Sequence, residues 1–198
     1  MAKEAKTYKH TFDLEGDWGG RLLHTQGIKD CIPIILHDLK INNIQAIFFV
    51  SGEIARECTQ EVRVIQKEGH VIGSHGMFHV DYKNYWRAET DRLEAEHLLK
   101  DLFDLRHEIP YRAPKFSHQV LEEPYSLPTD HCSLLKAMWL KPRLSSRTVF
   151  YTHPFDILKK PTTSAPTLFC KLWYSQPKRA YRKFKELLSR FHGERELR

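Results

Sequence analysis

Strand-like and helix-like segments alternate along most of the chain, and this alternation restricts the fold more than any other feature. Apolar or β-branched runs that favour strands lie at 8–14, 46–52, 70–75, 109–114 and 148–154. Apolar residues at helical spacing lie between them, at 31–43, 53–69 and 86–105. The pattern predicts βαβ units and a mainly parallel sheet, and therefore an α/β fold.

Details of the three expected helices can also be predicted. Pro33 fits a first helical turn, because proline lacks only an N–H that such a turn leaves without a partner. Gly69 suits the end of the second helix. In the third helix, part of the apolar face is expected to consist of Leu93, Leu98, Leu102 and Leu105.

The composition is that of one ordinary globular domain. With 198 residues, of which 41% are hydrophobic and 28% charged, the chain suits a single domain over 1–198. No apolar run is long enough to span a membrane, and the polar start lacks the apolar core of a secretory signal, so we expect a cytoplasmic protein. The cysteines form no CxxC pair and are expected to be reduced: Cys31, Cys58, Cys132 and Cys170.

Side chains capable of chemistry stand where several expected strands end. They are Asp13, Glu15 and Asp17 at the first, His75 and His79 at the third, Arg112 at the fourth and His153 at the last. Sites in parallel α/β folds are assembled from the carboxyl ends of several strands. The placement therefore favours one shared site.

The spacing of His75 and His79 allows two imidazoles to hold one cation, and a carboxylate from the first strand would complete three ligands. Three protein ligands leave room for water and substrate, as a catalytic metal requires. Asp13 could then accept a proton, His153 could donate one, and Arg112 would keep Asp13 ionised. Taken singly, each of these residues could have a purely structural role. Separate structural roles would not explain why all of them stand at the ends of expected strands.

Five segments resemble the polysaccharide deacetylases with a NodB-homology domain, the fourth carbohydrate esterase family. In order, they are TFDLEGDW, AIFFVSGEIA, EGHVIGSHGMFH, YRAPKFS and FYTHPFDI. The likeness covers roughly residues 8–158. It implies a distorted (β/α) barrel, a divalent metal that is usually zinc, and hydrolysis of an N-acetyl group on an amino sugar with release of acetate.

The resemblance also implies roles for individual residues. Asp13 matches the base, His75 and His79 match the metal-binding histidines, and His153 matches the acid. The backbone amide near Lys115 would help to hold the oxyanion.

The first motif departs from the adjacent aspartates that are usual in the family, because Leu14 takes the second position. Branches with an Asp-x-Glu arrangement exist, so Glu15 is the expected ligand and Asp17 the reserve. Alternate residues of a strand share a face, so Asp13 and Glu15 can both point into the barrel while Leu14 points outward.

The segment between Pro114 and His153 is shorter than in the family, which usually has another strand, a helix and an aspartate motif there. One hypothesis is that a strand–helix unit is missing after residue 118. The other is that 120–126 form a strand and Asp130 replaces the aspartate. An open side would be covered by a partner subunit in a homo-oligomer, would widen the cleft, or would abolish activity.

The basic segment 177–191 is expected to be a helix with an apolar face. It would either dock that face on the barrel or rest on an anionic membrane surface. Nucleic acid is not an expected partner, because no recognised module is present. Trp18 and Trp86 are candidates to stack on a sugar, with a structural role as the alternative. The expected apolar face of the 177–191 helix consists of Tyr181, Phe184, Leu188 and Phe191.

Together these features predict a metal-dependent N-deacetylase acting on an acetylated amino sugar, in a polymer or a sugar-linked precursor. One alternative is hydrolysis of a small non-sugar amide, as in allantoinase-like relatives. Another is a non-catalytic barrel used for binding or assembly. A binding module has no physical need for a base, an acid and metal ligands together, which favours an enzyme.

Overall fold

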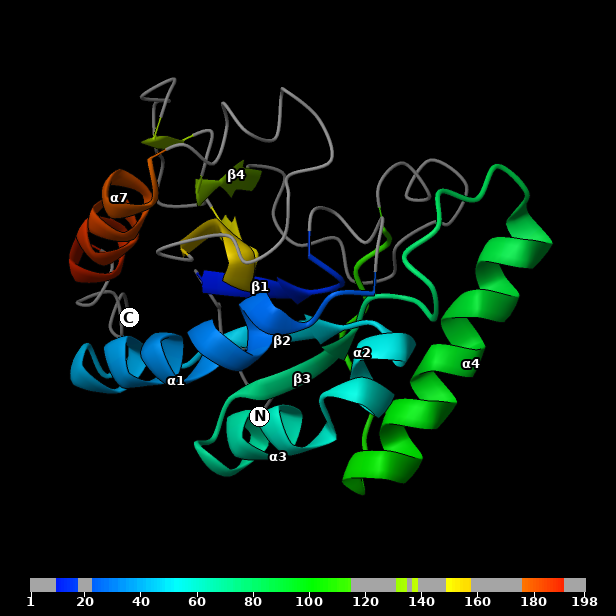
Figure 1. Ribbon diagram of the computed structural model, residues 1–198. Helices are drawn as coiled ribbons and strands as arrows, with labels where there is room; N and C mark the ends of the chain where they lie inside the picture. Colours follow the sequence, from blue (N-terminus) through cyan, green and yellow to red (C-terminus); the bar gives the residue numbers. More distant parts are fainter. Residues whose placement is uncertain are drawn as a thin grey trace, which may run out of the picture.

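The sheet at the centre of the molecule is parallel throughout (Figure 1). The structure, a computed structural model, describes residues 10–17, 23–114, 131–134, 137–138, 149–157 and 176–190. The strands are β1 (His10–Leu14), β2 (Ile47–Val50), β3 (Val71–Ser74), β4 (His131–Ser133) and β5 (Val149–Thr152). Their order is β3-β2-β1-β5-β4, so β1 lies in the middle. The predicted α/β fold with a parallel sheet is confirmed.

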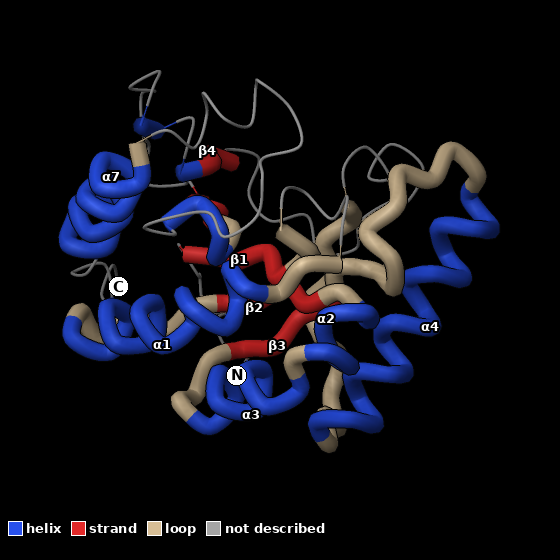
Figure 2. The backbone as a smooth tube through the Cα atoms, in the orientation of Figure 1, coloured by secondary structure: helices blue, strands red, loops and turns tan. Residues whose placement is uncertain are grey.

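Helices lie around this sheet, as Figure 2 shows, and most of them connect successive strands in the sequence. They are α1 (Gln26–Ile41), α2 (Gly52–Glu57), α3 (Thr59–Lys67), α4 (Tyr85–Phe103) and α7 (Pro177–Arg190). A 3-10 turn, η2 (Pro154–Ile157), follows β5. Among the described residues the sheet is open, with β3 and β4 at its two edges.

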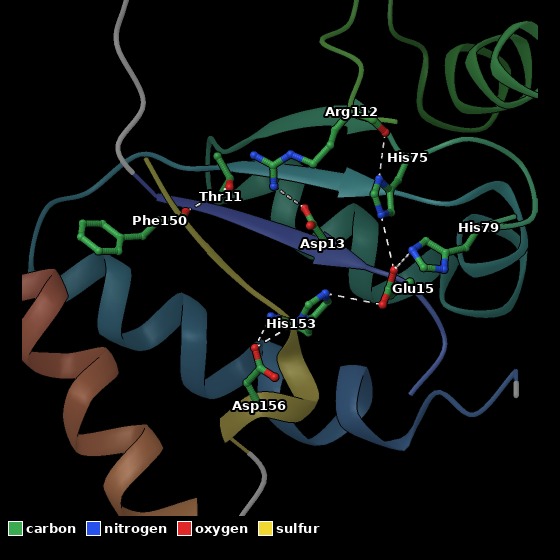
Figure 3. A network of polar contacts seen from close by, with 9 residues as sticks. All are labelled: Thr11, Asp13, Glu15, His75, His79, Arg112, Phe150, His153 and Asp156. Atoms are coloured by element: carbon green, nitrogen blue, oxygen red, sulfur yellow. Dashed lines mark hydrogen bonds and ion pairs between the residues drawn. The ribbon is translucent and has the colours of Figure 1, made fainter. Parts of the chain in front are cut away.

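Alternation along the strands separates a core face from a polar face. Phe12 and Leu14 of β1 and Phe48 of β2 are fully buried in the main hydrophobic cluster, together with apolar residues of the helices. Asp13 lies between Phe12 and Leu14 and points to the opposite side of the sheet (Figure 3). The side chains that hold the fold together and those that form a site thus come from the same strand.

The helix boundaries differ from the predicted ones in two places. Helix α1 begins at Gln26, so Pro33 lies inside it rather than in its first turn. The expected helix at 53–69 is divided at Cys58, whose φ of −122° and ψ of 36° depart from helical values.

The buried face of α4 is also different from the leucine face predicted for it. Leu93 is 50% exposed, and the buried face consists of Ala88, Asp91, Ala95, Leu99 and Phe103. These residues recur at spacings of three and four, which is the helical repeat. Ala88 packs with Tyr111 and Ala113 of the arginine-bearing segment 109–114, and the face includes one carboxylate, Asp91.

The segment 109–114 is not a full strand. It makes a single parallel bridge, between Tyr111 and Ser74, with hydrogen bonds from Arg112 N to the Ser74 carbonyl and from Ser74 N to the Pro110 carbonyl. Pro110 and Pro114 have no N–H to donate, which limits the pairing of this segment. Farther along, β4 pairs with β5 at a place where no strand was predicted. The predicted strand at 120–126 and Asp130 lie outside the described residues.

Helix α7 docks on the rest of the molecule by its apolar face. Ala180, Phe184, Leu187 and Leu188 are buried in the main cluster, and the Tyr181 hydroxyl donates to Asp38 Oδ2 of α1 at 2.8 Å. This is the docked arrangement of the two considered for the basic segment. In the described part of the chain, no helix has the length and apolarity needed to cross a membrane.

Candidate active site

Four separate segments bring their polar residues to one edge of the sheet (Figure 3). Asp13 comes from the end of β1 and Glu15 directly follows that strand. His75 follows β3, Arg112 follows the bridge at Tyr111, and His153 follows β5. The parallel arrangement places all these carboxyl ends together, as the sequence pattern predicted.

Glu15, His75 and His79 offer ligand atoms that all lie within 4.8 Å of one another. His75 Nε2 is 3.4 Å from Glu15 Oε2, and His79 Nε2 contacts the same oxygen. The side chains are at most 8% exposed. Two imidazoles and a buried carboxylate form a donor set that suits a divalent cation such as zinc.

The charge on Glu15 is maintained by its neighbours. Burial by itself would raise the pKa of this carboxyl, but His153, His75 and His79 together bring it well below the usual range. Glu15 is therefore ionised, which is the form that binds metal.

His75 is oriented by the backbone carbonyl of Arg112. Its Nδ1 lies 2.9 Å from the Arg112 carbonyl oxygen, which can only accept a hydrogen bond. Nδ1 therefore carries a hydrogen, and Nε2 is the nitrogen that faces Glu15. Such a bond fixes both the tautomer and the ring orientation of a metal-binding histidine.

Arg112 also binds Asp13, in the pairing predicted from the sequence. Its Nη1 donates to Asp13 Oδ1 at 2.6 Å, and its guanidinium lies over the Phe49 ring at 4.3 Å. Burial would raise the pKa of Asp13, but Arg112, His75 and His153 outweigh that effect and bring the pKa below its usual value. Asp13 is therefore an ionised carboxylate, able to accept a hydrogen bond from water.

His153 faces Glu15 on one side and Asp156 on the other. Its Nε2 is 3.5 Å from Glu15 Oε1, and its Nδ1 is 3.2 Å from Asp156 Oδ2. Burial would lower the pKa of His153, but the carboxylates of Asp156 and Glu15 raise it to about 10. The imidazole thus holds a proton at neutral pH.

Sequence reasoning missed two buried carboxylates that support these residues. Asp156 binds His153, and Asp91 of α4 binds the backbone of the loop between His75 and His79. The signal for Asp91 was its place in the helical repeat with Ala88 and Ala95. For Asp156, it was the three-residue spacing from a histidine at a strand end.

Other candidate residues lie apart from this cluster or beyond the described chain. Asp17 is 2% exposed and its Oδ2 accepts from Gly27 N at 3.2 Å, in the first turn of α1. Its burial raises its pKa to about 6. Trp86 is 75% exposed in the first turn of α4, where its ring contacts Tyr85. Trp18 and Lys115 lie outside the described residues.

The family is shown by the sequence itself. A family model described as polysaccharide deacetylase matches residues 3–122, more than half of the chain. The chain belongs to the polysaccharide deacetylase family.

Individual relatives cover different shares of the chain. A peptidoglycan-N-acetylglucosamine deacetylase of Bacillus cereus is 33% identical over 84 residues, which are 42% of this chain and 29% of that protein. The chain thus spans less than a third of that relative.

Solved structures support the fold. A family 4 carbohydrate esterase of Bacillus subtilis has a TM-score of 0.55 at 18% identity, covering 91% of this chain and 76% of that one. A CE4 family pseudoenzyme of Bacillus anthracis has a TM-score of 0.53 at 13% identity, covering 91% of this chain and 62% of that one.

Proposed function

We propose that this protein is a metal-dependent deacetylase that hydrolyses an N-acetyl group on an amino sugar, in a polymer or a sugar-linked precursor, and releases acetate. One observation carries the proposal: the buried donor set of Glu15, His75 and His79 lies at the same edge as Asp13 and His153. Membership of the family and the likeness to a peptidoglycan deacetylase support it.

Glu15, His75 and His79 would hold the metal, and zinc is the metal that two imidazoles and one carboxylate favour. A divalent cation bound there would act as a Lewis acid toward the acetamide carbonyl. Because the ligand atoms are buried and His75 is already oriented by the Arg112 carbonyl, little rearrangement of the chain would be needed on binding.

Asp13 and His153 would carry the proton transfers. Asp13 accepts the proton of the attacking water, while the water oxygen forms a bond to the acetamide carbon. His153 then donates its proton to the sugar nitrogen as the carbon–nitrogen bond breaks, which leaves acetate and a free amine. Arg112 holds the Asp13 carboxylate in place by the 2.6 Å hydrogen bond. Asp156 orients His153 from the opposite side.

The proposal is tested by measuring metal content and acetate release for the wild type, His75→Ala and Asp13→Asn. His97→Ala is the matched control, because His97 is an exposed histidine of α4. Substrates should include acetylated chitooligosaccharides and peptidoglycan fragments. We expect near-stoichiometric metal in the wild type, loss of metal in His75→Ala, and retained metal without acetate release in Asp13→Asn.

Other outcomes would decide between the alternatives. Metal without acetate release from any sugar in the wild type would favour a small non-sugar amide as the substrate. Absence of metal from all the proteins, even after zinc is added, would overturn the catalytic proposal in favour of a binding module.

Further parts of the proposal concern the cell and the assembly. We propose a cytoplasmic location and a homo-oligomer that covers the open side of the sheet. We also propose that exposed basic side chains of α7, such as Arg182 and Lys185, contact anionic lipid while the apolar face of the helix stays docked. Fractionation, light scattering and vesicle sedimentation test these three points. Limited proteolysis tests whether 1–198 is a single domain.

A further inference from the structure

Asp91 is a buried carboxylate that has no part in the proposed chemistry. It lies on the inner face of α4 with 4% of its surface exposed. Its Oδ2 accepts from Met77 N at 2.7 Å, and its Oδ1 accepts from Phe78 N at 3.3 Å and from the Tyr82 hydroxyl at 3.1 Å. Both oxygens of Asp91 are thus bound to the loop that carries His79.

The backbone of this loop has a conformation that needs support from outside. Gly76 has a φ of +73° and His79 a φ of +47°. The left-handed region is strained for a residue with a side chain, and such a conformation persists where the surroundings fix it. At Gly76 an added Cβ would lie 2.4 Å from Asp91 Oδ2, so the carboxylate packs closely against the turn.

The two N–H groups that Asp91 binds immediately precede His79 in the chain. Hydrogen bonds from N–H groups to an ionised carboxylate are stronger than those between neutral groups, particularly away from water. They fix the direction in which the chain leaves Gly76 and therefore where His79 places its ring. In the structure this ring meets Glu15, the oxygen of which is also 3.4 Å from His75.

We propose that Asp91 is a positioning residue for the metal site: it binds the Met77–Phe78 backbone and thereby holds His79 where it can bind the cation together with Glu15 and His75. This inference rests on the proposed function. It assigns Asp91 no contact with metal or substrate. Its specific consequence is that Asp91 influences metal affinity through His79, whereas a residue that merely stabilises the fold would have no such dependence.

The first experiment compares the zinc affinities of Asp91→Asn, Asp91→Ala and Tyr82→Phe with that of the wild type, by competition with a chelator. Asparagine has nearly the same volume but one acceptor oxygen, so it cannot accept from both loop N–H groups through separate oxygens. We expect both Asp91 variants to bind zinc roughly 10- to 100-fold more weakly. Tyr82→Phe removes a hydroxyl from the same carboxylate and leaves the backbone bonds, so its affinity should stay near the wild type's.

The second experiment is a double-mutant cycle with His79→Ala. Zinc affinity is measured at zinc concentrations high enough to detect the weakened site that His79→Ala leaves. Asp91→Ala should weaken zinc binding in the wild-type background but should have no further effect in His79→Ala. An equal loss in both backgrounds would overturn the inference. Wild-type affinity in both Asp91 variants would also overturn it. Circular dichroism checks that each variant folds. If Asp91→Ala does not fold, Asp91→Asn takes its place in the cycle.

A third readout requires no metal. Hydrogen exchange at the Met77 and Phe78 amides of the metal-free protein should be slow in the wild type and fast in Asp91→Ala, with β2 amides unchanged as the internal control. Fast exchange in the wild type would contradict the inference. If the wild type binds no zinc but exchange is slow, the proposed function fails while the support of the loop by Asp91 stands.

Discussion

The imidazole of His153 has partners on several sides. Asp156 lies at its Nδ1, the Phe155 ring stacks on it at a centroid distance of 4.9 Å, and the Tyr151 ring meets it edge-on at 5.9 Å. The turn η2 brings Asp156 back so that one oxygen binds both the ring and the backbone N–H of His153. A sequence pattern identifies His153, but the burial of Asp156 depends on how that turn folds.

We predict that Asp156→Asn lowers kcat for acetate release by roughly 10- to 100-fold with little change in KM. The reason is that the amide has no charge to favour the protonated imidazole and orients it less firmly. Steady-state kinetics on an acetylated chitooligosaccharide measure this, with the exposed Glu57→Gln as the control. A kcat equal to that of the wild type would show that His153 does not depend on Asp156.

His10 gives the fold a dependence on pH. It is 3% exposed in β1, stacks on Phe150, and has its pKa lowered by burial from 6.5 to about 4. Above pH 6.5 the residue is neutral in both the folded and the unfolded state. Between pH 6.5 and 4 the unfolded chain binds a proton that the folded chain does not, so stability falls as the pH falls.

The prediction is that the wild type loses roughly 2 kcal/mol more folding free energy than His10→Phe between pH 7 and pH 5. Urea unfolding of both proteins at the two pH values measures the difference. Phenylalanine preserves an aromatic contact with Phe150 and cannot titrate. Equal losses in the two proteins would mean that His10 is not kept neutral by the fold.

At the scale of elements, the sequence predicted best those segments whose periodicity is set by burial. The stripe of Ile54, Cys58, Val62 and Ile65 is fully buried as expected, because regular spacing reports which side faces the core. β4 has three residues, too few to show a period. The face of α4 was predicted from its leucines, whereas its buried residues also include Asp91 and two alanines. The contacts of Asp91 with the loop before His79 were missed because the prediction for this helix followed its leucines alone.

Helix α7 should contribute substantially to stability. Phe184 is 2% exposed and meets the ring of Phe12 in β1 edge-on, so Phe184→Ala should cost about 3–5 kcal/mol. Arg182→Ala, an exposed change in the same helix, should lie within about 0.5 kcal/mol of the wild type. Denaturant unfolding measures both. A small effect of Phe184→Ala would mean that α7 is not part of the cooperative unit.

At the scale of the whole molecule, the site exists only when the sheet is assembled. Its residues span from Asp13 to Asp156, and their order along the chain does not predict which atoms touch. The sequence predicted the α/β class, the grouping of Glu15, His75 and His79, and the pairing of Arg112 with Asp13. The supporting carboxylates required the folded structure, since their partners are backbone groups that any residue provides.

Zinc should therefore stabilise the folded state. A cation that binds only the native chain adds about 2.7 kcal/mol at a free concentration 100 times its Kd. We expect the melting temperature of the wild type and of His97→Ala to rise with zinc and to return with a chelator, while that of His79→Ala changes little. An equal rise in His79→Ala would place the zinc elsewhere.

Arg112 serves two neighbours with two different parts of itself: its side chain binds Asp13, and its carbonyl binds His75. Substitution affects these two contacts differently. Any amino-acid substitution at this position replaces the side chain, but every residue type keeps the backbone carbonyl. In evolution Asp13 can thus lose its partner in a single step while the orientation of His75 is retained. A descendant that had lost this arginine would keep His75 in the same orientation, and one reverse substitution would restore the ion pair with Asp13.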